Sequence, residues 1–399
     1  MLGDIKIIEL SNTIGGAACT KMLGDLGADV LKIEPPKVGD PSRYEPPFLG
    51  DGPEPERSAL FLAYNTNKRG ITLSLETEEG RDLLFKLIED VDVIVESYPV
   101  GYLDNLGIGY SALSAINPKA ILVSITPFGQ TGPYRDYSSS DLVIQAIGGH
   151  LITGGDKDRE PMAFPDTQSA FITGRNSGIA TMAAVLHQRQ TGQGQHVDFS
   201  EMEAFAQVWH ANRYSFTGEI SGRGTGGGQG NVMDSMHLEA EDGYITLATA
   251  GTSGADSMDA WADFFDLPEM KDPKWKSMRV RRENWQELKA LVESKLKKMK
   301  KYDFFQKAME KRLVVGVVQS PQDILNCPHF AFRDSLVELE HPVVGNLRYT
   351  GPGFLADNEN TASQGRAAPT MGQHNKEIYS DVLGLTEQQI ELLAGSGVI

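Results

Sequence analysis

The sequence contains few cysteines, no long apolar run and too little positive charge to balance its acids. Its 399 residues include only two cysteines, Cys19 and Cys327, whose spacing fits neither a metal site nor a disulfide framework. No apolar run approaches the length of a membrane span. Asp and Glu outnumber Lys and Arg by 54 to 37, and the net charge of -17 repels nucleic acid. We therefore expect a cytoplasmic protein that binds neither membranes nor nucleic acid.

Common catalytic signatures are also missing. The sequence has no G-x-S-x-G nucleophile elbow, no catalytic Cys-His signature, and no H-E-x-x-H or other cluster of metal ligands. Side-chain carboxylates are therefore left as the candidate nucleophiles, and no metal is expected.

The first half of the chain alternates between two patterns. Short apolar runs that predict strands lie at residues 5–10, 30–34, 91–96 and 120–125, with helical patterns at 17–26 and 80–89. A helix over residues 172–190 and a strand at 196–199 follow. This alternation predicts an α/β fold whose large domain is a Rossmann-like parallel sheet.

Composition divides the chain into a large and a smaller part. Residues 1–224 are predicted to form the first part of the large Rossmann-like domain. A charged, tryptophan-bearing helical region indicates a smaller α+β domain over residues 225–330. Residues 331–399 begin with a connection rich in Gly, Pro, Asn and Ser and end in an amphipathic helix, and we expect them to return to the large domain.

A glycine pair follows the first predicted strand. Glu34 ends the next strand nineteen residues after Gly15, a spacing also found in dinucleotide sites. The third glycine of G-x-G-x-x-G is missing, and a tight strand-to-helix turn explains Gly15 and Gly16 without a ligand. We therefore expect neither a nicotinamide nor a flavin cofactor.

A second glycine run, at residues 222–230, has three interpretations. It could be a phosphate-binding loop, a mobile lid or a linker. It lacks the Lys-Ser/Thr pair of a P-loop, and no helix is predicted directly after it, so nucleoside triphosphate binding has little support. Composition alone favours a linker over a lid.

Six short blocks stand in order along the chain and carry a resemblance to a known family. They lie at residues 24–36, 65–73, 128–134, 191–195, 242–244 and 372–374. Together they resemble class III coenzyme A (CoA) transferases, the group of formyl-CoA transferase and carnitine CoA-transferase. The similarity covers nearly the whole chain.

The resemblance implies an intertwined dimer with each active site between the large domain of one subunit and the small domain of the other. In that family, an Asp carboxylate attacks an acyl-CoA thioester to give a mixed anhydride, and the returning CoA thiolate then makes an aspartyl-CoA thioester. A lid must keep water from the anhydride. The residues that resemble the glycine lid are Gly226, Gly227, Gly228, Gln229 and Gly230.

The sequence departs from the family at positions that carry its chemistry. The nucleophilic Asp usually stands 21 residues before the position of Thr191, where this chain has Ala170. The nearest acid is Asp166. Ile14 stands where formyl-CoA transferase has a site-lining Gln, and Asn105 where the family commonly has an Arg for CoA. The resemblance leaves Lys68, Arg69 and Tyr98 as the predicted CoA-binding residues.

These departures favour one function and leave two alternatives. The favoured hypothesis is a nucleophile-lacking subunit of a heteromeric CoA-transferase whose homologous partner supplies the Asp, as in the succinyl-CoA:benzylsuccinate CoA-transferase of anaerobic toluene degradation. The alternatives are a self-sufficient homodimeric transferase that uses Asp166, and a non-catalytic acyl-CoA-binding protein. Racemisation is disfavoured because Ser140, beside Asp141, replaces the His of the racemases' His-Asp pair. Arg223 is a candidate to serve the partner's site.

Overall fold

The computed structural model describes residues 1–399 except 51, 155–158, 208–236, 248–257, 358–359 and 362–364. The chain divides into two compact units. Unit 1 comprises the described residues among 1–149, 164–208 and 328–399, and unit 2 those among 150–163 and 209–327. The predicted boundary between residues 224 and 225 lies outside the described residues.

Unit 1 is built on one parallel sheet of six strands in the order β3-β2-β1-β4-β5-β6. The strands are β1 (Lys6–Glu9), β2 (Asp29–Glu34), β3 (Lys68–Thr72), β4 (Val93–Glu96), β5 (Ile121–Thr126) and β6 (His196–Ser200). The order reverses between β1 and β4, as in doubly wound folds, which bind ligands at the carboxyl ends of the strands. The predicted α/β fold with a Rossmann-like parallel sheet is therefore confirmed.

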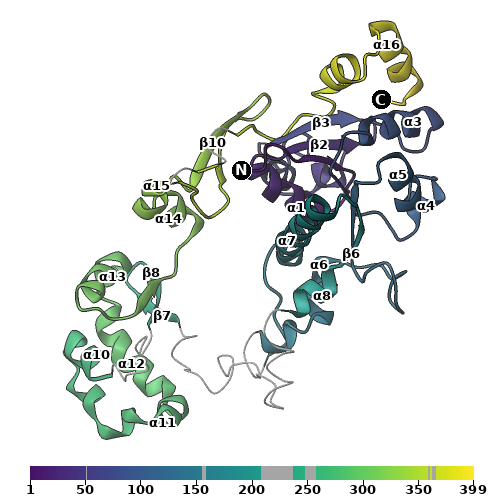
Figure 1. The fold of residues 1–399 in the computed structure, drawn as a ribbon. Helices are drawn as coiled ribbons and strands as arrows, with labels where there is room; N and C mark the ends of the chain where they lie inside the picture. Colours follow the sequence, from purple (N-terminus) through teal and green to yellow (C-terminus); the bar gives the residue numbers. More distant parts are fainter. Residues whose placement is uncertain (51, 155–158, 208–236, 248–257, 358–359, 362–364) are drawn as a thin grey trace. The chain divides into compact units, whose positions relative to one another are not determined.

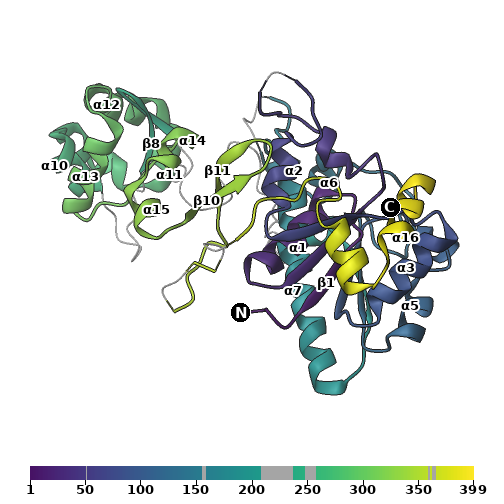
Figure 2. The same ribbon diagram turned by 90° about the horizontal axis from the view of Figure 1, so that it is seen from above.

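Helices cover both faces of this sheet (Figures 1 and 2). The helices of this part of unit 1 are α1 (Ile14–Asp25), α2 (Ala59–Tyr64), α3 (Glu78–Ile88), α4 (Tyr102–Asn105), α5 (Tyr110–Ile116), α6 (Asp141–Ile147), α7 (Gln168–Thr191) and α8 (Glu201–Ala206). Ile7 packs in the core with Ala184 of α7, whereas its neighbour Ile8 packs in the core with Leu84 of α3. Successive strand residues point to opposite faces, so the continuous apolar runs serve two cores.

Helix α7 begins earlier than the apolar period predicts. The period indicated a start near Ile172, but the helix begins at Gln168 and ends at Thr191, with Gly192 as its C-cap at a φ of 74°. Its N-cap, Thr167, makes no side-chain capping bond. Instead, Asp141 of α6 accepts the main-chain N–H of Ser169 at 2.8 Å. A distant side chain thus satisfies an N–H group of the first turn, and local sequence carries no sign of it.

Unit 2 is a small α+β unit. Its antiparallel sheet consists of β7 (His237–Ala240), β8 (Gly243–Leu247) and β9 (Val315–Val317). Its helices are α10 (Met258–Phe265), α11 (Met278–Glu283), α12 (Trp285–Leu296), α13 (Lys301–Glu310) and α14 (Pro321–Leu325). Trp261 is fully buried and stacks on Phe265 and Phe304 with centroid distances of 5.7 and 6.0 Å. These aromatic rings give unit 2 a core of its own.

The C-terminal segment packs on unit 1. It contains α15 (Pro328–Phe332), the hairpin of β10 (Leu336–His341) and β11 (Gly345–Thr350), a π-helical turn (Glu377–Val382) and α16 (Glu387–Ser396). The buried Tyr379 hydroxyl donates to the carbonyl of Thr72 in β3 at 2.6 Å. None of the helices in the described part of the chain is long and apolar enough to cross a membrane.

Candidate active site

Helices α1 and α7 lie side by side and run parallel (Figure 1). A Cβ added at Gly174 would lie 2.4 Å from the Cβ of Ala18, and one at Gly178 would lie 2.2 Å from the Cε of Met22. The two contacts are four residues apart in both helices, which fixes a parallel register. A side chain at Gly174 would also meet the backbone of α1 and force the helices apart, whereas at Gly178 the flexible end of Met22 would have to move aside.

This register brings the first turns of α1 and α7 to the same end of the sheet. Ile14 opens α1 after the carboxyl end of β1, and Ala170 lies one turn before Gly174 in α7. Both are half-buried. Two of the positions at which the chain departs from the class III pattern, Ile14 and Ala170, are therefore at matching ends of two packed helices, at the end of the sheet where doubly wound folds bind ligands.

Asp141 holds the first turn of α7 in place. One of its carboxylate oxygens accepts the N–H of Ser169 at 2.8 Å and the Ser169 hydroxyl at 2.5 Å. The other accepts from the side-chain amide of the buried Gln145, also at 2.5 Å. Ser140 caps α6 one residue earlier, with its hydroxyl accepting from Val143 N–H. Both oxygens of Asp141 are thus engaged next to Ala170.

Asp166 lies outside the helix. Its side chain is exposed, and its φ of 61° places it in the left-handed region, two residues before the first residue of α7. Asp tolerates this conformation better than most residues, which suits a sharp entry into the helix. The nucleophilic role of Asp166 stays a prediction.

Glu201 is a carboxylate near this site that sequence analysis missed. It is the first residue of α8, directly after β6 ends, and is half-buried. Its Oε1 lies 3.1 Å from the point where a Cβ on Gly15 would stand. Burial, with a smaller contribution from the charge of Asp141, raises the pKa of Glu201 to about 7. Its position, an acid immediately after the carboxyl end of a strand, is the signal that could have found it.

Lys68 is buried inside unit 1. Its ammonium group lies 2.8 Å from a carboxylate oxygen of Glu9, 2.9 Å from the carbonyl of Ala17 and 2.8 Å from the side-chain oxygen of Asn65. Burial lowers the pKa of Lys68 to about 8. These partners use all three donors, so a phosphate would have to displace one of them, and the contact of Lys68 with CoA stays a prediction.

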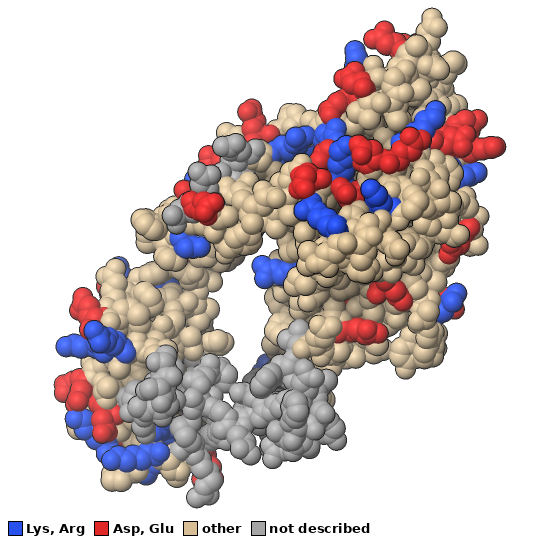
Figure 3. All heavy atoms as spheres, viewed as in Figure 1, with Lys and Arg blue, Asp and Glu red and all other residues tan. Residues whose placement is uncertain are grey.

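Arg69 lies nearer the surface. Its guanidinium pairs with Asp29 and with Glu377, each at 2.7 Å, and its side chain is 19% exposed. On the face shown in Figure 3, acidic and basic side chains are interspersed over unit 1, which is the distribution that ion pairs like those of Arg69 give. A phosphate would have to displace or join these carboxylates, and the contact of Arg69 with CoA stays a prediction.

Tyr98 follows the carboxyl end of β4. Its N–H donates to Glu96 at 2.7 Å, and its ring packs against Tyr102 at a centroid distance of 4.5 Å. Burial raises the pKa of the Tyr98 hydroxyl. Asn105, which replaces the expected Arg, is exposed at the end of α4. Tyr98 is thus at the ligand-binding edge of the sheet, and its contact with CoA stays a prediction.

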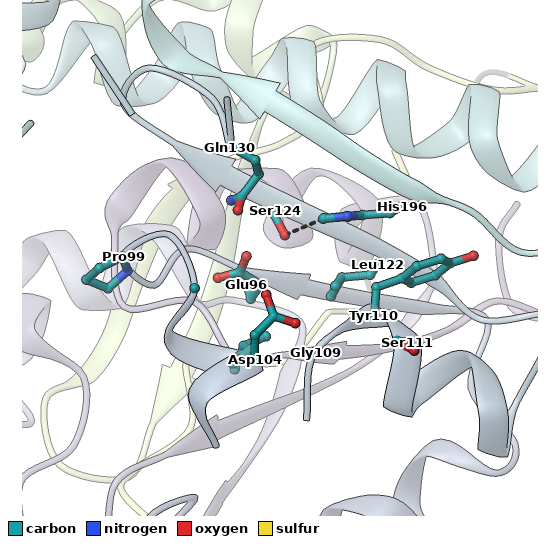
Figure 4. Close-up of a pocket in the computed structure, with 12 residues that line it drawn as sticks. Glu96, Pro99, Asp104, Gly109, Tyr110, Ser111, Leu122, Ser124, Gln130 and His196 are labelled. Atoms are coloured by element: carbon teal, nitrogen blue, oxygen red, sulfur yellow. Dashed lines mark hydrogen bonds between the residues drawn. The ribbon is translucent and has the colours of Figure 1, made fainter. Parts of the chain in front are cut away.

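A small polar cavity lies beyond Tyr98, where β4, β5 and β6 meet the segment from α4 to α5 (Figure 4). Its volume is about 90 Å³. His196 and Ser124 share a hydrogen bond of 2.8 Å, and Tyr110 stacks on the imidazole at 5.5 Å. Burial raises the pKa of Glu96, on the same wall, to about 7. The cavity is large enough for only a few water molecules.

The predicted glycine lid, residues 226–230, and Arg223 lie outside the described residues. Their roles therefore stay predictions.

The sequence profile of CoA-transferase family III matches residues 2–375. The chain belongs to CoA-transferase family III. Its relatives include succinyl-CoA–D-citramalate CoA-transferase of Chloroflexus aurantiacus, 32% identical over 100% of this chain and 98% of that protein. Another is succinyl-CoA:(R)-benzylsuccinate CoA-transferase subunit BbsE of Thauera aromatica, 31% identical over 99% of this chain and 97% of that protein.

Solved structures agree with the family assignment. The structure of a CAIB/BAIF family protein from Brucella suis has a TM-score of 0.82 and 31% identity, and the match covers 96% of this chain and 99% of that one. A family III CoA-transferase takes an acyl-CoA thioester and a carboxylic acid as substrates. The resemblance seen in the sequence is thereby confirmed, as is the conclusion that the protein is an enzyme of this class.

Proposed function

We propose that this chain is the subunit of a heteromeric family III CoA-transferase that lacks the usual nucleophile. It assembles with a homologous chain that carries Asp at the position of Ala170. The assembly moves CoA from succinyl-CoA to an organic dicarboxylate of the benzylsuccinate type.

One observation carries the proposal: the first turn of α7 is held firmly in place although it carries no carboxylate at the usual position of the nucleophile. Asp141 accepts two hydrogen bonds from Ser169, and these hold the first turn of α7 in place. Ala170, the next residue, has only a methyl group there. A subunit whose partner supplies the nucleophile needs such a scaffold for assembly but not the carboxylate itself.

The relatives support the substrate class and the assembly. Succinyl-CoA is named in the relatives from both Chloroflexus aurantiacus and Thauera aromatica, and the latter is named as a subunit. The acceptors named there, D-citramalate and benzylsuccinate, are both dicarboxylic acids. A dicarboxylate offers one carboxylate for reaction and a second for recognition.

A second candidate, a self-sufficient transferase that uses Asp166, has one observation in its favour. Asp166 is exposed and stands two residues before α7, on a segment whose left-handed residue marks a turn. This turn would have to rearrange to bring the carboxylate of Asp166 to the position of the usual nucleophile, at Ala170.

One experiment separates the two candidates. The chain is purified alone and together with a homologous chain that carries the Asp, and CoA transfer from succinyl-CoA to benzylsuccinate and to aliphatic dicarboxylates is measured. Asp166→Asn is tested in each preparation. Strong activity that needs the mixture and is unaffected by Asp166→Asn supports the heteromer. Activity of the chain alone that disappears in Asp166→Asn contradicts it.

A further inference from the structure

We infer that Glu201 supplies a nucleophilic carboxylate to the site built on this chain's own unit 1, where Ala170 supplies none. The inference goes beyond the proposed function, which requires chemistry only at the partner's Asp. It shares with that function the premise that the assembly transfers CoA.

The position of Glu201 next to the first turn of α7 carries the inference. A Cβ on Gly15 would stand 3.1 Å from Oε1 of Glu201 and 2.8 Å from Cγ2 of Thr173. Both side chains therefore lie over Gly15, at the first turn of α1. Only glycine leaves room for both.

Two side chains near Ala170 also lie near the Glu201 carboxylate. Thr173 follows Ala170 by three residues and lies on the same face of α7. Asp141, which binds Ser169 directly before Ala170, is close enough to Glu201 for its charge to act on it. The carboxylate therefore lies next to the first turns of α1 and α7, and α7 carries the position that usually holds the nucleophile in its first turn.

The carboxylate of Glu201 is free to react. Within the described part of the chain, neither a hydrogen bond nor an ion pair engages it, and the side chain is half-buried rather than sealed. Glu9, by contrast, is fully buried and bound to Lys32 and Lys68. A partly desolvated, unpaired carboxylate is a stronger nucleophile than a hydrated one.

Two helix N-termini near this site favour negative charge on the reaction's intermediates. The first turns of α1 and α7 present the positive ends of two helix dipoles, and these stabilise negative charge that develops on an attacked carbonyl. The groups that face Glu201 from the packed helices are Gly15 of α1, Thr173 of α7 and Asp141 of α6. Asp141 is the only one of these that carries a charge, and both of its oxygens already accept hydrogen bonds from Ser169 and Gln145.

The proposed steps balance without a further reactant. A carboxylate oxygen of Glu201 attacks the thioester carbonyl of succinyl-CoA, the C–S bond breaks, and CoA leaves as a thiolate with the electron pair. The thiolate attacks the glutamyl carbonyl of the resulting anhydride and releases succinate. An acceptor carboxylate then attacks the glutamyl-CoA thioester, and the same two steps in reverse order release the new acyl-CoA and regenerate Glu201.

Trapping with hydroxylamine tests the inference. The chain, alone and mixed with its homologous partner, is incubated with succinyl-CoA and then with hydroxylamine, which converts a glutamyl thioester into a hydroxamate. We expect peptide mass spectrometry to find the hydroxamate on Glu201. It should be absent in Glu201→Gln and present in Glu203→Gln, the matched control at an exposed Glu two residues later. An unmodified Glu201 in an assembly that transfers CoA overturns the inference.

Turnover separates this inference from the proposed function. In a mixture whose partner has its Asp replaced by Ala, we expect the remaining transfer to fall about a hundredfold or more with Glu201→Gln. Glu201→Asp, which keeps the charge on a shorter side chain, should retain part of it, and circular dichroism checks that each variant is folded. No effect of Glu201→Gln overturns the inference, whereas no transfer with the partner's Asp intact contradicts the proposed function instead.

Discussion

Asp141 binds Ser169 twice, accepting its main-chain N–H at 2.8 Å and its hydroxyl at 2.5 Å across 28 residues of sequence. This contact ties α6 to the start of α7, directly before the position that usually holds the family's nucleophile. The main-chain hydrogen bond satisfies an N–H group of the first turn, which the N-cap residue Thr167 does not do with its side chain.

Removing the acceptor should loosen this end of α7. Asp141→Ala is expected to lower the free energy of unfolding by about 1.5 to 3 kcal/mol, because hydrogen bonds to a charged group are lost and Ser169 N–H is left without its acceptor. Ser169→Ala keeps the main-chain bond and should cost only about 0.5 to 1.5 kcal/mol. Urea unfolding followed by circular dichroism measures both. Equal losses in the two variants would contradict the capping role.

Restoring the missing carboxylate should change the activity of the chain alone. Ala170→Asp places an Asp in the first turn of α7, where a helix dipole favours negative charge. If the scaffold around Ala170 is intact, we expect CoA transfer by the isolated chain to rise about tenfold or more over wild type. Ala170→Asn has nearly the same shape and no nucleophile, and it should show no gain. The initial rate with succinyl-CoA as the donor is the measurement.

Glu96 should make stability depend on pH. Burial raises its pKa from an ordinary value of 4.5 to about 7, so the folded state holds its proton over a range in which the unfolded state has lost it. The free energy of unfolding should therefore fall as pH rises from about 4.5 to 7. Glu96→Gln, which cannot ionise, should match wild type at pH 5 and exceed it by about 1 to 3 kcal/mol at pH 8.

Urea unfolding at the two pH values measures this difference. Glu89→Gln, at an exposed Glu, is the control and should leave the pH dependence unchanged. A Glu96→Gln variant whose stability follows that of wild type at every pH would show that Glu96 does not hold a proton in the folded state.

Lys68 and Arg69 are adjacent in sequence but should differ sharply in their effect on stability. Lys68→Met leaves the fully buried Glu9 with one cation fewer and should cost about 3 to 5 kcal/mol. Arg69→Ala breaks partly exposed pairs and should cost less than about 1 kcal/mol. Thermal unfolding and CoA titration calorimetry are run together. If Lys68→Met left the stability unchanged and weakened CoA binding, Lys68 would be a contact of a CoA phosphate and not a residue that stabilises the fold.

The sequence alone determined the fold class and the family. Apolar runs separated by helical periods led to the parallel sheet, because buried parallel strands need apolar residues on both faces. Gly192 ended α7 where the T-G-Q-G block predicted it. The family blocks lie within short stretches of the chain, so they could be read without knowing what each stretch touches.

Only the tertiary structure decided which charged side chains are buried, what they pair with, and which residues surround Ala170. Whether Lys68 is buried depends on Glu9, 59 residues away, and the start of α7 depends on Asp141. Glu201 lies close to Gly15 because β6 and β1 end at the same edge of one parallel sheet. The physical reason is common to all three: the solvation and partners of a polar side chain are set by segments distant in sequence, which residue type and spacing do not encode.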